Sequence, residues 1–317
     1  MRTGARWAVF IIAVLALSVW AAGMAFFHVH PALAAVCPAV GIALLWLHRR
    51  RPRRAWAALL VSAGLAGFGW SLLTPLQDRD WADEVSRMPR YRLDGTILTL
   101  TDVRDFAWST RTDYDARWVE KKVDLEGLRT VDVALSYWMG PAIAHTLVSF
   151  GFEDGQVLTF SVEIRKERHE LFDALAGFFR NYEMALIVAE ERDILRVRAD
   201  VRGEQLYLYR VDLSREAMQA LLREYLHELD ALHAQARFYN SLTANCTTVI
   251  LALVRRAVGY VPLDWRILLS GYLDAYLYEK GRLDTQLPFE TLKRQARVPQ
   301  GSSAEISPQH YSRFVRE

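Results

Sequence analysis

Three apolar runs fill the first 75 residues and limit what this chain can fold into more than any other feature. The first run, residues 7–27, contains no charged side chain and has the length of about 20 residues that a helix needs to cross a bilayer core. The second run, residues 31–47, is at the short end for a span, and the third covers about residues 55–75. These runs predict three transmembrane helices that form a membrane anchor over residues 1–75.

Basic residues predict how this anchor lies in the membrane. Residues 48–54, His-Arg-Arg-Arg-Pro-Arg-Arg, separate the second run from the third, and Arg2 and Arg6 precede the first. Because Lys and Arg near span ends stay on the cytoplasmic side, everything after residue 75 is expected outside. The chain is therefore predicted to be a multi-pass protein of a bacterial inner membrane with a periplasmic C-terminal domain. The alternative is that the second and third runs form a re-entrant pair.

The rest of the chain has an ordinary soluble composition, in which strand-like segments precede most of the helical ones. Segments rich in β-branched and aromatic residues predict strands at residues 96–100, 118–125, 130–138, 143–150, 157–164, 182–190, 194–199 and 205–211. Helical patterns cover residues 81–88, 214–236, 245–258 and 265–280. This order predicts an α+β domain over residues 76–297, with an antiparallel sheet packed on helices. Residues 298–317 are expected to be a disordered tail.

Charge and cysteine content narrow the partners that this chain is expected to have. The net charge of +2 and the mixing of basic with acidic residues give no support for a nucleic-acid partner. Cys37 lies in an apolar run and Cys246 in the soluble part, so a disulfide between them is not expected. The tether after the third run is short, which favours a membrane lipid or a lipoprotein as substrate. Nothing in the sequence indicates an oligomeric state.

Cys246 is the first candidate for chemistry. It begins a predicted helix in which residues 249–254 are almost wholly apolar, so this helix is expected to be buried. The unpaired N–H groups and the dipole at a helix N-terminus favour a thiolate, which is a nucleophile once a base is near. The Cys246 N–H and the Asn245 side chain are candidates to bind an oxyanion. The alternative is a small apolar side chain that fills the core, as most lone cysteines do.

His145 is the candidate base, because it alone of the eight histidines lies inside a predicted strand. The turn Gly-Phe-Glu-Asp-Gly at residues 151–155 predicts a hairpin between that strand and the next. Glu163 then lies on the strand beside His145, where a carboxylate would fix the tautomer of the histidine and stabilise its charged form. Glu167 is a weaker substitute. The alternatives are a histidine hydrogen-bonded within the sheet and a solvated carboxylate at a strand end.

Several motifs follow one another in a fixed order along the chain. They are His-Thr-Leu-Val-Ser-Phe at 145–150, Ser-Val-Glu-Ile-Arg-Lys-Glu at 161–167, Gly-Phe-Phe-Arg-Asn-Tyr-Glu at 177–183, Glu-Glu-Arg-Asp at 190–193 and Tyr-Asn-Ser-Leu-Thr-Ala-Asn-Cys-Thr-Thr at 239–248. This set resembles the Lnb N-terminal periplasmic domain family over roughly residues 105–258. The family takes its name from a Bacteroides lipoprotein N-acyltransferase, and its domain is similar to circularly permuted papain-like thiol enzymes.

The resemblance implies a permuted papain-like domain in which the histidine strand precedes the cysteine helix, which is the order of His145 and Cys246 here. The catalytic residues that it implies are Cys246 as nucleophile, His145 as base and Glu163 as the group that orients the base. The candidate oxyanion or supporting residues are Asn245, Tyr239 and Asn240. Unlike the name-giving members, this chain has three predicted spans before the domain.

The expected function is cysteine-dependent acyl transfer on a lipid or lipoprotein at the periplasmic face, with no metal or organic cofactor. Two alternatives stay open. In one, the same Cys-His dyad hydrolyses a cell-wall peptide or amide, which predicts a polar, open cleft instead of an apolar groove. In the other, the domain binds envelope proteins without catalysis, which predicts an unreactive Cys246 far from His145.

Overall fold

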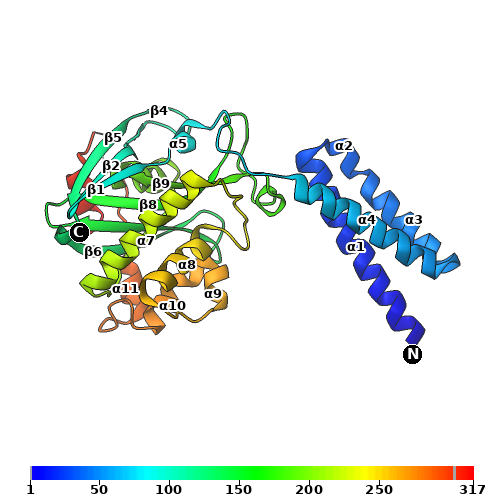
Figure 1. Cartoon of the computed structure of the whole chain (residues 1–317). Coiled ribbons are helices and arrows are strands. Elements are labelled where there is room, and N and C mark those ends of the chain that lie inside the picture. The colour runs from blue at the N-terminus through cyan, green and yellow to red at the C-terminus, as the bar shows by residue number, and fades with distance from the viewer. Residues whose placement is uncertain (1, 303–304) are drawn as a thin grey trace. The chain divides into compact units, whose positions relative to one another are not determined.

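The computed structural model describes residues 2–302 and 305–317, and these residues form two compact units. Figure 1 shows the helices of the first unit in blue and the strands of the second mainly in cyan and green. The first unit comprises the chain up to Leu76 together with Asp173–Tyr182, and the second comprises Gln77–Phe172 and Glu183–Glu317. The chain therefore passes between the two units three times.

The first unit is built from apolar helices. They are α1 (Arg2–His28), α2 (Pro31–Ala34), α3 (Val36–Arg50) and α4 (Pro52–Leu72). Among the described residues, three helical stretches are long and apolar enough to cross a membrane, namely Gly4–His28, Pro31–Arg50 and Pro52–Leu72. The prediction of three apolar helices in this region is confirmed. The break before α4 falls at a proline, which suits the first helical turn because it has no N–H to satisfy.

Aromatic contacts show how α1 and α4 run relative to each other. Near the start of both helices, the rings of Phe10 and Trp56 lie 4.9 Å apart between centroids. Near the end of both helices, the rings of Trp20 and Trp70 lie 5.4 Å apart. The two helices are therefore parallel, and α3 runs back along them, with the His48 ring tilted against that of Phe10 at 4.3 Å between centroids. The predicted membrane topology requires this same arrangement.

The second unit is organised around one sheet. Its strands are β1 (Arg90–Asp94), β2 (Ile97–Arg104), β3 (Ala107–Trp108), β4 (Tyr114–Asp115), β5 (Trp118–Asp124), β6 (Leu128–Tyr137), β7 (Ala144–Phe152), β8 (Val157–Arg165), β9 (Glu183–Ala189) and β10 (Gln205–Arg210). Within the described residues, eight strands form the sheet in the order β1-β2-β9-β8-β7-β6-β10, with β5 also paired to β2, while β3 and β4 form a separate ribbon. Neighbours are antiparallel except β2 and β9. The central strand β9 is buried along its whole length, as a strand covered on both faces must be.

Two helices pack directly on this sheet. α7 (Arg215–Ala234) contacts β6 and β9, and α8 (Cys246–Val258) contacts β7 and β8. Figure 1 shows α7 lying across the strands. The ring of Tyr225 on α7 packs against Phe150 of β7 and Phe160 of β8. The predicted α+β class is therefore confirmed. Further helices of this unit include α5 (Asp83–Ser86), η1 (Leu125–Gly127), α9 (Trp265–Leu268), η4 (Ser270–Tyr272), α10 (Leu273–Glu279) and α11 (Phe289–Gln295).

The strand predicted over residues 194–199 is wrong. This segment forms helical turns, α6 (Glu191–Ile194) and the π-helical η3 (Val197–Val201). Apolar and basic residues alternate in this segment, but Arg198 is itself buried and paired with carboxylates. Tertiary ion pairs have thus overridden the local pattern.

The prediction of a disordered tail is also wrong where the structure describes it. α12 (Pro308–Phe314) forms there, and the Tyr311 side chain is completely buried. The Arg316 guanidinium donates to both carboxylate oxygens of Glu191 at 2.7 and 2.8 Å. A bidentate pair of this kind holds the tail on the domain although its sequence is polar. Residues 303–304 of the predicted tail lie outside the described residues.

Candidate active site

His145 and Glu163 meet at one end of the β7–β8 hairpin, and the predicted hairpin itself is confirmed. The last paired residues of these strands at that end are Leu147 and Ser161, so His145 and Glu163 lie just beyond the ladder. The Nε2 atom of His145 lies 3.2 Å from Oε1 of Glu163 and 2.7 Å from Oγ of Ser161. Ser161 in turn donates to Glu163 Oε1 at 2.7 Å. These contacts fix the orientation of the imidazole ring.

Cys246 is the first residue of α8, and the helix start is held by a capping box. The Asn245 side-chain oxygen accepts hydrogen bonds from the N–H groups of Thr247 and Thr248, both at 2.9 Å. The Thr248 hydroxyl accepts from the Asn245 N–H at 2.9 Å. Thr247 also contacts Thr146 of β7 through their hydroxyl oxygens, 3.2 Å apart. This last contact joins the start of α8 to the strand of His145.

The Cys246 thiol is buried, with 8% of the residue exposed, and it lies close enough to the His145 side chain for the charge of that imidazole to act on it. Burial by itself raises the pKa of this thiol, because it disfavours the charged form. The His145 imidazole and the Thr146 backbone together lower the pKa by more, so the net shift is downward. Since Nε2 of His145 contacts Glu163 and Ser161, the other ring nitrogen is the one left for the thiol.

The His145 imidazole is poised to carry a positive charge. Burial and the nearby Arg198 lower its pKa, whereas the Glu163 carboxylate and the Cys246 thiolate raise it. The net effect is a pKa raised to about 9. Glu163 responds in the opposite sense: burial raises its pKa, but His145 and Arg198 hold it well below the usual range. The arrangement therefore favours a thiolate, an imidazolium and a carboxylate in a row. Such a row is the pattern of an activated nucleophile with an oriented base.

Arg198 is a member of this cluster that the sequence did not indicate. Its guanidinium donates to Glu163 Oε1 at 3.0 Å and lies 3.5 Å from Glu204. Ser161 was likewise given no role, although it stands two residues before Glu163 on β8. Alternation along a strand puts residues i and i+2 on one face, so that spacing was the available signal for Ser161. Arg198 offered none, because its segment was interpreted as a strand.

The predicted supporting residues have separate positions. Asn245 caps α8 and donates to the Ser241 carbonyl at 2.8 Å. The Asn240 side chain accepts from the N–H groups of Leu242 and Thr243, which closes the tight loop before the cysteine helix. Tyr239 lies close to Cys246, whose backbone and side chain both act on the pKa of its hydroxyl. Asn240 and Asn245 thus shape the loop, whereas Tyr239 lies beside Cys246.

Residues 114–271 match the family model of the Lnb N-terminal periplasmic domain. The chain carries this domain. The match spans all three predicted catalytic residues, and the resemblance noted from the sequence motifs is confirmed. Together with the three helices that are long and apolar enough to cross a membrane, it makes the chain a membrane protein with a periplasmic domain. No curated protein and no solved structure matches the chain.

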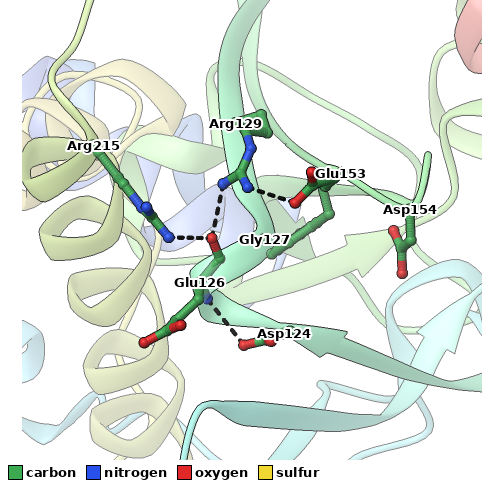
Figure 2. Close-up of a pocket in the computed structure, with 8 residues that line it drawn as sticks. Asp124, Glu126, Gly127, Arg129, Glu153, Asp154 and Arg215 are labelled. Carbon is green, nitrogen blue, oxygen red and sulfur yellow. Dashed lines mark hydrogen bonds and ion pairs between the residues drawn. The ribbon is translucent and has the colours of Figure 1, made fainter.

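A polar hollow on the Lnb domain lies away from these residues. It is bounded by the β5–β6 turn and the β7–β8 turn, with Arg129 paired to Glu153 at 2.5 Å (Figure 2). His145 is at one end of β7 and Phe152, which lines the hollow, is at the other, about 23 Å away at about 3.3 Å per residue. The hollow is therefore separate from the thiol. Among the described residues, no group of three His, Cys, Asp or Glu side chains comes together to hold a metal ion.

Proposed function

We propose that this protein is a membrane-anchored acyl-transfer enzyme in which Cys246 is the nucleophile, His145 the acid and base, and Glu163 the residue that orients His145. The observation that carries the proposal is that α8 and β7 meet through Thr247 and Thr146, 3.2 Å apart, which brings the buried Cys246 thiol close enough to His145 for the imidazole to lower the pKa of that thiol. The alternative of a binding domain predicted these two residues far apart. Their proximity favours chemistry over a structural cysteine.

The first half of the reaction forms an acyl-enzyme. The Cys246 thiolate attacks the carbonyl carbon of an ester in a lipid donor, and the carbonyl oxygen becomes an oxyanion. The Tyr239 hydroxyl, beside Cys246, is the donor that stabilises it. As the ester C–O bond breaks, His145 gives its proton to the departing alcohol. A thioester on Cys246 remains, with His145 neutral.

The second half releases the acyl group. An amine, such as the N-terminal amine of a lipoprotein, attacks the thioester carbonyl, and His145 takes one of its protons. The C–S bond breaks, the thiolate returns beside the imidazolium, and an amide is formed. If water attacks instead, the same intermediate gives hydrolysis. No cofactor enters either half of this scheme.

The same proposal places the protein in a bacterial inner membrane as a multi-pass protein with the Lnb domain in the periplasm. The parallel directions of α1 and α4 support this topology. Two parallel spans end on the same side of the membrane, which in this topology is the periplasmic side. Arg49 and Arg50 lie over the rings of Trp7 and Trp46, at the opposite end of the helices. Basic residues at that end fit the cytoplasmic side.

The test is to trap the thioester on Cys246. Full-length protein in detergent is incubated with a phospholipid that carries an alkyne-tagged acyl chain, and labelled protein is measured before and after hydroxylamine treatment. The expected result is a hydroxylamine-sensitive label that Cys37→Ser retains and Cys246→Ala lacks. Label that is absent with phospholipid, while peptidoglycan fragments are cleaved by the wild type and not by Cys246→Ala, would instead establish wall hydrolysis. The absence of both activities would overturn the proposal.

A further inference from the structure

The segment Asp173–Tyr182 joins β8 to β9, yet it belongs to the unit of the apolar helices. A short helical turn, η2 (Ala176–Phe179), lies within it. The ring of Phe179 stacks on Phe27 of α1, with 5.4 Å between centroids. His28, the last residue of α1, is hydrogen-bonded to the Phe179 carbonyl. A piece of chain between two sheet strands is thus docked on the end of a membrane-type helix.

Gly23 shows how far down α1 this contact reaches. A Cβ atom placed on Gly23 would meet the far end of the Phe179 ring, so this ring lies directly against the glycine. Gly23 is five residues before His28, which corresponds to about 7.5 Å along the helix axis. The Phe179 ring therefore packs beside the apolar stretch Gly4–His28 itself and not merely on its end.

Arg180 gives a second reference for depth. It donates to the Trp70 carbonyl at 3.1 Å, and its guanidinium lies over the Trp70 indole at 4.4 Å from the ring centroid. Trp70 is close to the end of α4. Tryptophan rings at span ends favour the headgroup level of a bilayer, and an arginine there keeps its charge in the polar zone. The segment is therefore fixed near the membrane–water boundary by α1 and by α4.

Two apolar side chains of this segment do not pack into the helices. Leu175 is 64% exposed and Phe178 is 41% exposed. Apolar side chains at the level of a bilayer boundary have a lower free energy in lipid than in water. The difference is about 25 cal/mol for each Å² of apolar surface removed from water. The next residues, Phe179 and Arg180, already contact α1 and α4. The lipid around these helices is therefore the apolar surface that Leu175 and Phe178 can reach.

We propose that Asp173–Tyr182 is a membrane-interface anchor whose Leu175 and Phe178 side chains insert among phospholipid headgroups and upper acyl chains. The partner is the lipid bilayer itself. The anchor ties the Lnb domain to the membrane at a point other than the tether after α4. Glu163 lies on β8, the strand that leads into this segment, so the strand that carries the carboxylate of the site is also the strand that leads to the bilayer.

The test measures how deeply the two side chains lie in lipid. Full-length protein with Cys37→Ser and Cys246→Ser receives one nitroxide label, at Leu175→Cys or at Phe178→Cys, and is reconstituted into phosphatidylethanolamine–phosphatidylglycerol vesicles. Collision rates with oxygen, which enters lipid, and with a water-soluble nickel chelate are compared by electron paramagnetic resonance. Leu65→Cys on α4 is the lipid-exposed control and Leu93→Cys on β1 the water-exposed control, since both residues are exposed in their own units.

The expected oxygen-to-nickel ratio at Leu175 and Phe178 is several-fold above that at Leu93 and approaches that at Leu65. A ratio equal to that at Leu93 at both positions would overturn the anchor. All four labels are on exposed side chains, so none of them requires the core to repack. The background lacks the Cys246 thiol, so the result is independent of the proposed chemistry and each proposal can fail alone.

Discussion

Oε1 of Glu163 lies 3.2 Å from Nε2 of His145 and also accepts a hydrogen bond from Arg198 at 3.0 Å. One carboxylate oxygen thus stands between a histidine and an arginine. The Glu163 charge raises the pKa of His145 and the Arg198 charge lowers it. Removing the Glu163 charge should therefore lower the pKa of the imidazolium, and removing the Arg198 charge should raise it. The protonation state of the Cys246 thiol should change with it.

The alkylation rate of Cys246 should report this charge state directly. In Cys37→Ser protein, we expect rapid alkylation that persists well below pH 8.5, the ordinary pKa of cysteine being about 8.5. In His145→Ala, burial of the thiol is no longer opposed by the imidazolium, so the reaction should move to higher pH. Iodoacetamide rates measured from pH 5 to 10 give both profiles. A thiol that reacts only after the protein unfolds would mean a structural cysteine.

Glu163→Gln should shift the pH dependence of acyl transfer, because it removes the charge of the side chain and keeps its size. The wild-type His145 keeps its proton up to a pKa of about 9, so activity that needs the imidazolium should decline above that pH. Without the Glu163 charge, burial and Arg198 both lower the pKa, so the alkaline limb should move to lower pH. The stability that the His145–Glu163 pair contributes is full below about pH 6.5 and is lost as pH rises through about 9.

Glu167→Gln is the matched control for this shift. Glu167 was the substitute considered from the sequence, but the structure pairs it with Arg79 at 2.6 Å. We expect its pH profile to coincide with that of the wild type. An equal shift in both variants would mean that net charge, and not the contact with His145, sets the profile.

The residues of this site were predictable to different degrees for physical reasons. Cys246 and His145 could be found because a helix start and a strand interior are local features of sequence. Glu163 followed from the hairpin, whose register places it across from His145 just beyond the last ladder pair. Arg198 could not be found, because its position depends on η3, a helical turn stabilised by distant carboxylates.

The elements of the fold were also predictable only where they depend on local sequence. The three apolar helices and the major strands follow from hydrophobic pattern, which acts locally. The edge strand β1 (Arg90–Asp94) is largely exposed and polar, so it carries no such pattern, and only its pairing with β2 makes it a strand. The docking of Asp173–Tyr182 on α1 and α4 likewise depends on contacts between segments about 100 to 150 residues apart.

Tyr239→Phe should slow acyl transfer while leaving alkylation nearly unchanged. Burial raises the pKa of Tyr239 well above 10, as do the charges of Cys246 and Glu163, so its hydroxyl stays protonated and able to donate. Loss of one oxyanion donor typically lowers kcat by about 10²–10³-fold. Iodoacetamide alkylation forms no oxyanion and needs no such donor. Tyr260→Phe, at an exposed tyrosine, is the control. An equal fall in both rates would mean that Tyr239 only positions the thiol.

Asp193→Asn should be among the most destabilising single changes outside the site. Asp193 is completely buried, and it accepts hydrogen bonds from Arg104 at 2.7 and 3.1 Å, from the Trp108 indole at 2.7 Å and from the Phe106 N–H at 3.0 Å. An asparagine presents N–H donors to these donors and leaves the buried Arg104 charge without a counter-charge. The expected loss of unfolding free energy is roughly 3–5 kcal/mol.

Asp102→Asn is the matched control for that loss, because Asp102 pairs with Arg87 at 3.1 Å on the surface of the same domain. Exposed pairs of this kind contribute about 0–1 kcal/mol, so its melting temperature should stay close to that of the wild type. Thermal unfolding of both full-length variants in detergent, followed by circular dichroism, compares them directly. Equal melting temperatures for the two variants would show that the Asp193 cluster adds no more to the fold than a surface pair.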